Sequence, residues 1–334
     1  MAKITLKEIA AMANVSAMTV SNVVHGKDSK VSKHVKEKVL NLVEQYNYVP
    51  NQNASNLRTG SSKMIGVVFY TKEKRIDFTD PFISSVLTGI ENIARKNGYF
   101  TMIQSIRSSS EIEILQRNWT FAGFIAVGVS SEDFIKVDKK FHTPVSYIDT
   151  YPPKGQNLVA SARNFIGTDE ASVSKLAVDY LINKGHKNIL FYSFEFDEKP
   201  SVIQNRFLSF KKFFERNGGK KFEISTARSS TYQDVLKSVE PYLVSQPFTA
   251  IYATADILAV KLNQIFKGIS IIGVDNAEFS EFISPKLTTI AIDQVKKGEI
   301  AMKYLIKSIR TGVSNNFYSK SSLIERESVQ PKKD

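Results

Sequence analysis

The sequence has no cysteine among its 334 residues. Disulfide bonds, thiolate nucleophiles and cysteine-ligated zinc sites are therefore excluded. No apolar run approaches the roughly 20 residues that a membrane-spanning helix needs, and the first residues lack the apolar segment of a signal peptide. We expect a cytoplasmic protein that does not contact a membrane.

Catalytic motifs are missing as well. The chain has no GxGxxG or P-loop sequence for phosphate and no HExxH pair for zinc. Of the four histidines, His25 and His34 lie in the basic N-terminal region, and His186 stands in a helix-to-strand turn that favours a structural role. Because no nucleophile and base can be assigned to one site, we expect that the protein is not an enzyme and has no catalytic residue. We also expect no metal site and no cofactor.

Positive charge, in contrast, is abundant and unevenly placed. The net charge is +12, and residues 1–63 hold nine Lys or Arg residues against four acids. Such a surplus suits a polyanionic partner, because each neutralised phosphate releases condensed counterions. On charge alone, a solvated basic surface explains the surplus equally well.

Three short helices are predicted in this basic region. Thr5 and Glu8 have the spacing of a capping box at the start of the first helix. A second helix over residues 17–24 follows a capping Ser16, and a third covers residues 32–46. Two helices joined by a tight turn and supported by a third form a helix-turn-helix.

The second helix has valines on one side and short, uncharged, hydrogen-bonding residues on the other. Such a face fits a DNA major groove about 12 Å wide, where short side chains let the backbone approach the bases. A three-helix bundle with neutral surface residues is the alternative. Beyond it, residues 51–58 form at most two helical turns, whose Leu57 is placed to act as a minor-groove wedge.

From Lys63 onward, predicted strands and amphipathic helices alternate. Strands are expected at 64–70, 99–104, 121–127, 144–148, 188–193, 222–225, 250–253 and 269–274. Alternation implies right-handed crossovers and parallel sheets, and the rhythm restarts near residue 165. The predicted fold class is a small all-α helix-turn-helix domain with a hinge helix, followed by a two-lobed α/β core.

Two α/β lobes usually bind a ligand between them, at the carboxyl ends of their strands. Polar and aromatic residues follow the predicted strands at Asp80, Phe82, Asp149, Arg206 and Asp275. Carboxylates and an arginine suit the hydroxyl groups of a sugar, and an aromatic ring suits its apolar face. Each aspartate alone is more often a turn residue or helix cap, so this effector site depends on their convergence.

Several motifs resemble the lac/galactose/purine repressor (LacI/GalR) family of bacterial regulators. They are Leu6-Lys-Glu-Ile-Ala, Asn14-Val-Ser, Thr19-Val-Ser, Val31-Ser, Tyr48-Val-Pro-Asn51 and Leu57-Arg-Thr-Gly60, then Asp80-Pro-Phe, Gly167-Thr-Asp-Glu170, Arg206-Phe-Leu-Ser-Phe, Thr254-Ala-Asp256 and Ile272-Gly-Val-Asp275. The resemblance implies that the second helix reads operator bases and that Leu57 is the hinge wedge. It also implies that the core has the fold of periplasmic sugar-binding proteins.

The DNA-binding candidates come from the capped helix starts, the second helix and the hinge. They are Thr5, Leu6, Ser16, Ala17, Met18, Thr19, Ser21, Asn22, His25, Val31, Ser32, Tyr48, Asn51, Ala54, Ser55, Leu57 and Arg58. By the resemblance, Ala17, Met18 and Asn22 are the base readers.

For the whole chain, the resemblance implies a homodimer on a pseudo-palindromic operator in the nucleoid, released by a small sugar effector. The spacing of residues 70–80 and 106–118 is most like that of repressors of galactoside-utilisation genes, which favours a galactose-containing sugar. Asn22 and Ala255 depart from the family pattern, so the resemblance fixes neither the operator sequence nor the identity of the effector. A catabolite-control-type regulator with a phosphoprotein corepressor and a solute-binding sugar receptor are the alternatives.

The predicted domains follow from these elements. Residues 1–50 form the DNA-binding headpiece, 51–62 the hinge and linker, and 63–334 the effector-binding and dimerisation core. The first lobe of the core is expected over residues 63–163 and 290–320, and the second over residues 164–289 and 321–330.

Overall fold

The computed structural model describes residues 4–48, 62–71, 76–153 and 162–332. The chain divides into two compact units, Met1–Ser62 and Lys63–Asp334, which we call the headpiece and the core. Each has a hydrophobic interior of its own. Among the described residues, none of the helices combines the length and apolar character needed to cross a bilayer.

The headpiece consists of the three predicted helices, α1 (Leu6–Ala13), α2 (Ala17–Val24) and α3 (Lys33–Gln45). The capping box is confirmed: the Thr5 hydroxyl accepts from the Glu8 backbone N–H at 3.3 Å, and the Glu8 carboxylate accepts from the Thr5 N–H at 2.7 Å. Ser16 and Ser32 cap the other two helices. The helices close over a small core at Ile9, Ala10, Ala13, Val20, Val23, Val39 and Tyr48.

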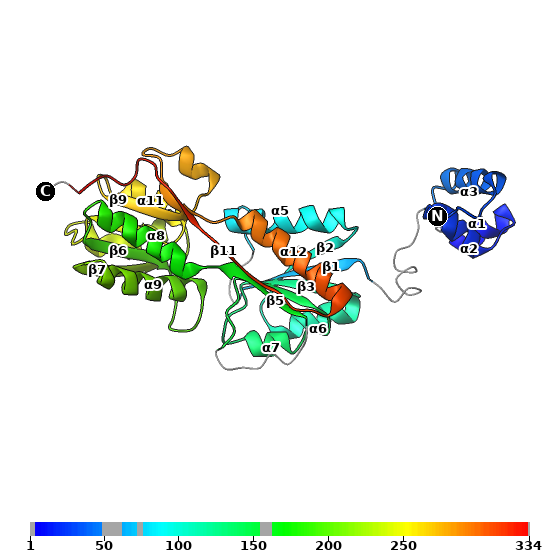
Figure 1. The fold of residues 1–334 in the computed structure, drawn as a ribbon, viewed down its shortest axis with the longest axis horizontal. Helices are drawn as coiled ribbons and strands as arrows, with labels where there is room; N and C mark the ends of the chain where they lie inside the picture. The colour runs from blue at the N-terminus through cyan, green and yellow to red at the C-terminus, as the bar shows by residue number, and fades with distance from the viewer. Residues whose placement is uncertain (1–3, 49–61, 72–75, 154–161, 333–334) are drawn as a thin grey trace. The chain divides into compact units, whose positions relative to one another are not determined.

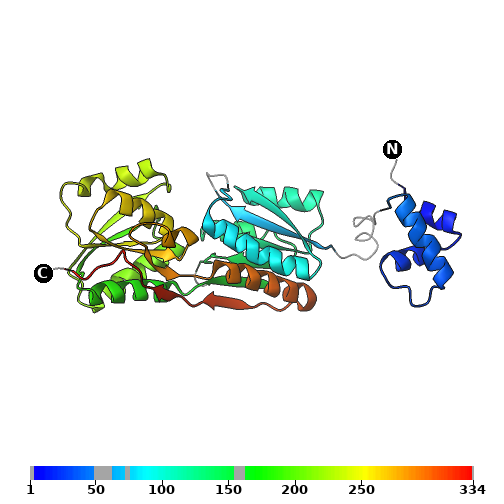
Figure 2. The same ribbon diagram turned by 90° about the horizontal axis from the view of Figure 1, so that it is seen from above.

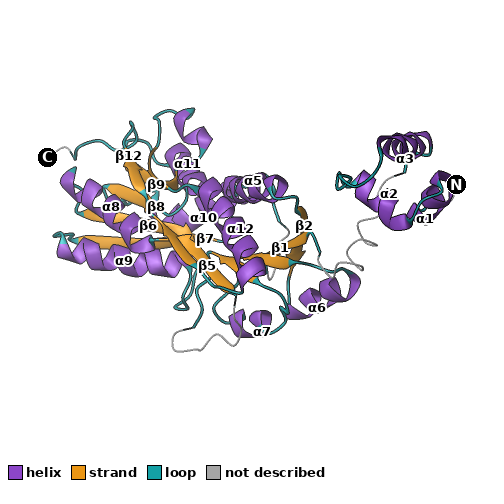
Figure 3. Ribbon diagram, turned by 45° about the vertical axis from the view of Figure 1, so that its right-hand side comes forward, coloured by secondary structure: helices purple, strands orange, loops and turns teal. Residues whose placement is uncertain are grey.

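The first lobe of the core has a six-stranded parallel sheet between two layers of helices (Figures 1 and 3). Its strands, in spatial order, are β11 (Asn316–Ser319), β5 (Arg163–Thr168), β4 (Val145–Ile148), β3 (Gly123–Val127), β1 (Met64–Tyr70) and β2 (Phe100–Ile106). Helices α5 (Pro81–Lys96) and α12 (Gln294–Thr311) cover one face, and α6 (Ser109–Asn118) and α7 (Phe134–Asp138) cover the other.

The second lobe repeats this plan. Its strands, in spatial order, are β12 (Ser322–Ile324), β10 (Thr288–Ala291), β9 (Ser270–Asp275), β8 (Ala250–Ala253), β6 (Asn188–Phe194) and β7 (Lys221–Ala227), with β12 alone antiparallel. Helices α8 (Glu170–Asn183) and α9 (Val202–Arg216) cover one face, and α10 (Tyr232–Val239) and α11 (Asp256–Ile265) the other. Most central strands are buried along their whole length, as expected of parallel sheets covered on both sides.

The chain crosses between the lobes three times, after β5, after β10 and between β11 and β12 (Figure 2). Two predicted lobe boundaries need correction. Residues 164–168 belong to the first lobe, because β5 pairs with β4 and β11 there. Residues 290 and 291 belong to the second lobe, because β10 pairs with β9 and β12.

Two glycines let α5 and α12 pack against each other at very short range. A Cβ atom added at Gly89 would lie 1.9 Å from the carbonyl oxygen of Val295, and one at Gly298 would lie 2.1 Å from that of Val86. Both positions therefore exclude any side chain. This close packing fixes the first turn of α12, which contributes to the cavity described below.

Candidate functional site

The outward face of α2 is built from a short arc of the helix. Met18 is 58% exposed, Thr19 and Asn22 are partly exposed, and His25 is exposed at the C-terminal end. Val20 and Val23 point into the headpiece core on the opposite side. The predicted division into a valine side and a surface side is therefore present, although nothing in the structure tests DNA contact itself.

Two predicted DNA-binding side chains do not lie on the surface. Ser21 is only 4% exposed, because it shares the inward arc of α2 with Ala17 and Val24, four residues before it and three after it. Tyr48 is 9% exposed and packs in the headpiece core. The sequence-based assignment of Ser21 to the outward polar face was wrong.

The other headpiece candidates are distributed between caps and surface. Thr5, Ser16 and Ser32 are exposed N-cap residues, and Leu6, Ala17 and Val31 are partly buried. The hinge candidates Asn51, Ala54, Ser55, Leu57 and Arg58 lie outside the described residues.

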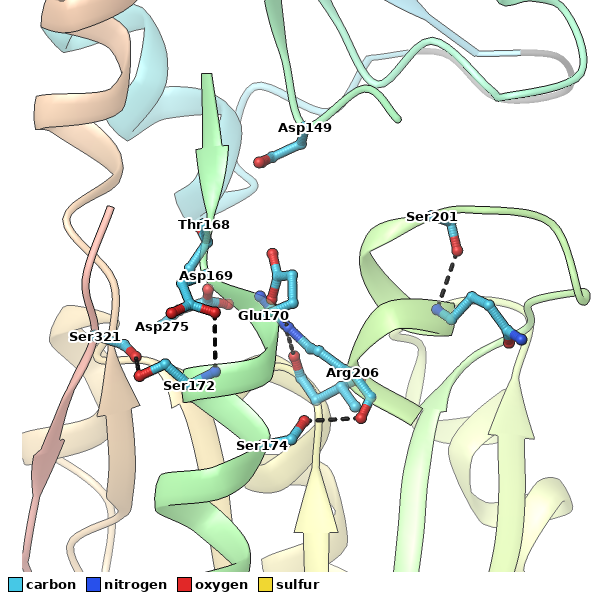
Figure 4. Close-up of polar contacts among 12 residues, drawn as sticks. Asp149, Thr168, Asp169, Glu170, Ser172, Ser174, Ser201, Arg206, Asp275 and Ser321 are labelled. Carbon is cyan, nitrogen blue, oxygen red and sulfur yellow. Dashed lines mark hydrogen bonds and ion pairs between the residues drawn. The ribbon is translucent and has the colours of Figure 1, made fainter. Parts of the chain in front are cut away.

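The core contains a cavity of about 300 Å³ between its two lobes. All five residues predicted to bind an effector line it: Asp80, Phe82, Asp149, Arg206 and Asp275. Asp149 stands on the first lobe, across the cavity from Arg206 and Asp275 of the second (Figure 4). The convergence on which the prediction depends is therefore present, while effector binding by these residues stays a prediction.

The backbone at two of these aspartates is unusual. Asp149 follows β4 with φ 49°, and Asp275 ends β9 with φ 116°. A positive φ in a residue with a Cβ atom costs of order 1–3 kcal/mol and is found preferentially at functional sites. Both carboxyl groups thus stand at the carboxyl ends of their strands in a conformation that the surrounding structure has to hold.

Asp149 is held by a lysine on another element. Lys297 lies in the first turns of α12 with 1% of its surface exposed, and its Nζ donates to both Asp149 carboxylate oxygens at 2.8 and 2.7 Å. It also donates to the Thr168 hydroxyl at 3.2 Å and lies 5.6 Å from the centre of the Phe82 ring. The lysine therefore neutralises and orients the carboxylate of the first lobe.

A second buried ion pair belongs to the second lobe. Arg206 donates through Nε to Glu170 Oε2 at 2.6 Å (Figure 4). It also donates through Nη1 to the Thr254 carbonyl oxygen at 2.7 Å. Burial raises the pKa of Glu170, although the arginine opposes this shift. Burial alone would lower the pKa of Arg206, but the neighbouring carboxyl groups, Glu170 first, raise it above its ordinary value.

Among the described residues, Asp275 forms no ion pair. In the same part of the chain, its carboxyl group accepts one side-chain hydrogen bond, from Nε2 of Gln294 at the start of α12, at 3.2 Å. Burial raises its pKa to about 7, with Arg206 partly opposing the shift. Because Gln294 belongs to the first-lobe helix and Asp275 to the second-lobe sheet, this contact joins the two lobes.

Two further acids line the cavity in supporting roles. Asp80 caps α5 by accepting from the Phe82 N–H at 2.8 Å, and burial raises its pKa. Asp256 accepts from Thr289, Ser280 and the Ala277 N–H, and burial raises its pKa to about 6. The apolar wall consists of Pro81, Phe82, Phe194, Val202, Ile203, Ala255, Ile257, Ala277 and Phe279.

Sequence reasoning did not assign five residues in or beside the cavity to this site: Glu170, Thr254, Asp256, Gln294 and Lys297. Glu170 was visible as part of a family-like motif, but its pairing with Arg206 was not. A lysine on an amphipathic helix predicts a solvated face, so no local signal marked Lys297 as buried. Among the described residues, no group of His, Asp and Glu side chains is arranged to hold a metal ion.

Both the headpiece and the core match families of known proteins. Residues 5–51 match the family described as "Bacterial regulatory proteins, lacI family", and residues 178–329 match "Periplasmic binding protein-like domain". The HTH-type transcriptional regulator MalR of Staphylococcus xylosus is 28% identical, over 98% of each chain. The ribose operon repressor of Lactococcus lactis subsp. lactis (strain IL1403) is 26% identical, over 91% of this chain and 90% of its own.

A solved structure has the same fold over nearly the whole chain. The lac repressor dimer bound to operator and the anti-inducer ONPF matches with a TM-score of 0.82 and 22% identity, over 98% of this chain and all of that chain. The headpiece match, the core match and the full-length relatives agree. The chain therefore carries a DNA-binding domain of the lacI family of bacterial regulatory proteins, followed by a periplasmic binding protein-like domain, and it is a DNA-binding transcriptional regulator.

Proposed function

We propose that this protein is a cytoplasmic repressor of sugar-utilisation genes, which binds a pseudo-palindromic operator as a homodimer and leaves it when a small sugar occupies the cavity. The observation that carries the proposal is the convergence of Asp80, Phe82, Asp149, Arg206 and Asp275 on one cavity between the lobes. Hydrogen-bonding groups and an aromatic ring in a partly apolar cleft are the combination that a small polar ligand requires.

The relatives support both parts of this proposal. One is a ribose operon repressor, and a solved structure of the same fold holds operator together with an anti-inducer. A galactose-containing sugar is the first effector to test, because the spacing of residues 70–80 and 106–118 favoured it.

The two lobes offer a physical basis for the response. Asp149 and Phe82 contact the cavity from the first lobe, and Arg206 and Asp275 contact it from the second. A ligand that touches both sides favours the lobe arrangement in which all contacts form, and it shifts the population by its difference in affinity for the two arrangements. We propose that this arrangement no longer holds the hinge helices of two subunits together on the operator.

The proposal is tested by finding the operator and then titrating sugars. Selection from random DNA duplexes would define the preferred sequence, and fluorescence anisotropy would follow its release by ribose, galactose, glucose and lactose. We expect at least one sugar to release the wild-type protein. Asp275→Ala should bind the operator as wild type does and lose the response, while a response equal to wild type would contradict the cavity assignment.

The hinge proposal has its own test. Leu57→Ala should weaken binding to the selected operator far more than binding to random DNA of equal length, because a wedge contributes only where a base step opens. Equal losses on both DNAs would contradict the wedge. If operator binding instead strengthens only with a phosphorylated protein partner, the corepressor alternative replaces induction by sugar.

A further inference from the structure

The second lobe has a small polar pocket at the edge of its sheet where the strands begin. Lys187, Lys220 and Thr249 each stand one residue before a strand, β6, β7 and β8 respectively. These strands are neighbours in the order β8, β6, β7, so the three residues lie side by side. The cavity between the lobes lies at the opposite ends of these strands and shares no lining residue with this pocket.

A third lysine reaches the pocket from the C-terminal segment. The backbone N–H of Lys332 donates to the Lys184 carbonyl oxygen at 2.8 Å, which fixes this segment beside the turn before β6. A Cβ atom added at Gly185 would lie 3.3 Å from the Cβ atom of Lys332, so the lysine side chain starts directly against this turn. The pocket has a volume of about 110 Å³ and is lined by Gly185, Lys187, Asn188, Lys220, Thr249 and Lys332.

The pocket brings three positive charges together and no negative one. None of its six lining residues is an acid. Among the described residues, the three pocket lysines form no ion pair, whereas their neighbours do: Lys184 pairs with Glu325 and Lys221 with Glu223, each at 2.8 Å. Like charges held on neighbouring strands repel each other. An anion in the pocket would relieve this repulsion.

Backbone hydrogen bonds hold the bases of these side chains in place. The N–H groups of Lys220 and Lys221 donate to the Lys187 carbonyl oxygen at 2.8 and 3.3 Å, and the Thr249 N–H donates to the Asn188 carbonyl oxygen at 2.9 Å. The lysine side chains themselves are exposed. The fold therefore sets where the three lysines start, and their ammonium groups are able to adjust to a ligand.

A buried histidine is connected to the pocket through Thr249. His186 is 3% exposed, its Nε2 lies 2.8 Å from the Gln330 carbonyl oxygen, and its Nδ1 lies 3.0 Å from Thr249 Oγ1. Because Nε2 faces a carbonyl oxygen, this nitrogen carries the proton of the neutral ring, and Nδ1 is the acceptor that faces the threonine hydroxyl. The His186 ring therefore reports on the occupancy of the pocket.

We propose that this pocket binds a small oxyanion, a phosphate group that is either free or carried by a small metabolite, through the ammonium groups of Lys187, Lys220 and Lys332. Lysine binds phosphate as a point charge, and a phosphate group offers a charge of about −1.5 to −2 and three acceptor oxygens. Liquid water occupies roughly 30 Å³ per molecule, so the pocket has room for one phosphate group in place of several waters. The site is independent of the proposed effector cavity, and its failure would leave the proposed function unchanged.

The test follows the histidine rings of the full-length protein by proton–nitrogen correlation spectra. Sodium phosphate is titrated while sodium chloride is lowered to hold the ionic strength constant, and His186→Gln identifies the His186 resonances. We expect these resonances to shift along a saturable curve. His142, exposed on the first lobe, is the internal reference and should not shift with the same curve.

Three variants of equal charge change locate the site. Lys187→Gln and Lys220→Gln should each weaken phosphate binding about 3- to 10-fold. Lys221→Gln is the matched control, because it removes the same charge one residue away from a side chain that pairs with Glu223 and does not line the pocket. Its phosphate affinity should equal that of wild type. Phosphate should also raise the melting temperature of wild type more than that of either pocket variant.

Glucose 6-phosphate and AMP in the same titration distinguish the sources of the phosphate group. Tighter binding of either ester than of inorganic phosphate assigns the pocket to a phosphorylated metabolite, and equal or weaker binding assigns it to the free ion. A shift that does not saturate, or equal losses in Lys220→Gln and Lys221→Gln, would overturn the site and leave the lysines as a solvated surface. A response of His186 to duplex DNA alone, with none to the small anions, would overturn it in favour of a DNA contact.

Discussion

Replacing Lys297 by methionine tests how the cavity is held together. The substitution removes a buried ammonium group whose Nζ lies 2.8 and 2.7 Å from the two oxygens of Asp149. The side chains of Lys297 and Asp149 are 2% and 10% exposed, so little water can replace the lost cation. Breaking a buried pair by removing one partner costs roughly 3–5 kcal/mol, because it leaves an uncompensated charge.

The double variant isolates the cause of this loss. Combining Lys297→Met with Asp149→Asn removes the unpaired charge, and we expect it to recover most of the free energy of unfolding, since apolar or neutral groups in place of a buried pair are often tolerated. Lys303→Met is the control on the same helix. Its ion pair with Glu299, at 3.1 Å, has side chains 49% and 30% exposed, so its loss should cost less than about 1 kcal/mol.

Urea unfolding followed by circular dichroism measures these differences, with ligand absent. The slope against urea should be alike in all four proteins, so that midpoints report the free energy of unfolding. A loss below about 1 kcal/mol in Lys297→Met, or no recovery in the double variant, would refute the reasoning that the lysine neutralises a buried carboxylate.

Three further outcomes are expected. Burial raises the pKa of Asp275 to about 7 from 3.8, so the folded protein binds this proton more tightly than the unfolded chain does. The stability that this protonated carboxyl group contributes is therefore lost as pH rises from about 4 to 7. Asp275→Asn should flatten the fall in melting temperature over this pH range, and an unchanged profile would contradict the pKa shift. Gly298→Ala should destabilise the core by several kcal/mol or prevent folding, because the new Cβ would lie 2.1 Å from the Val86 carbonyl oxygen. A variant with wild-type stability would show that α5 and α12 can separate. Asn22→Ala should change which DNA sequence is selected while leaving the melting temperature of the headpiece unchanged, because the side chain lies on the outward arc of α2; an unaltered selected sequence would remove it from the base readers.

Local signals in the sequence were sufficient for the headpiece. The capping pair Thr5 and Glu8, the caps at Ser16 and Ser32, and the valine spacing of α2 all act over three or four residues, so they can be seen in the chain itself. The same reasoning placed most strands and helices of the core within a few residues of their ends. It failed for Ser21, because a small polar residue inside the buried arc has the same local pattern as one outside it.

The effector cavity shows where local reasoning ends. The strand-end position of Asp149 and Asp275 is a local feature, and parallel sheets place such ends at a common edge. Lys297 joins Asp149 across 148 positions of the sequence, and Gln294 meets Asp275 only because the chain returns to the first lobe between β10 and α12.

The sequence by itself therefore determined the kinds of elements, their caps, the family and the candidate acids of the cleft, because each depends on contacts within a few residues or on recognisable motifs. Only the tertiary structure decided which lobe β5 joins and which cation neutralises Asp149. These properties depend on distances between elements far apart in the chain. Burial then determines how much each contact contributes to the free energy of unfolding, because a charge or hydroxyl removed from water must find its partner within the fold.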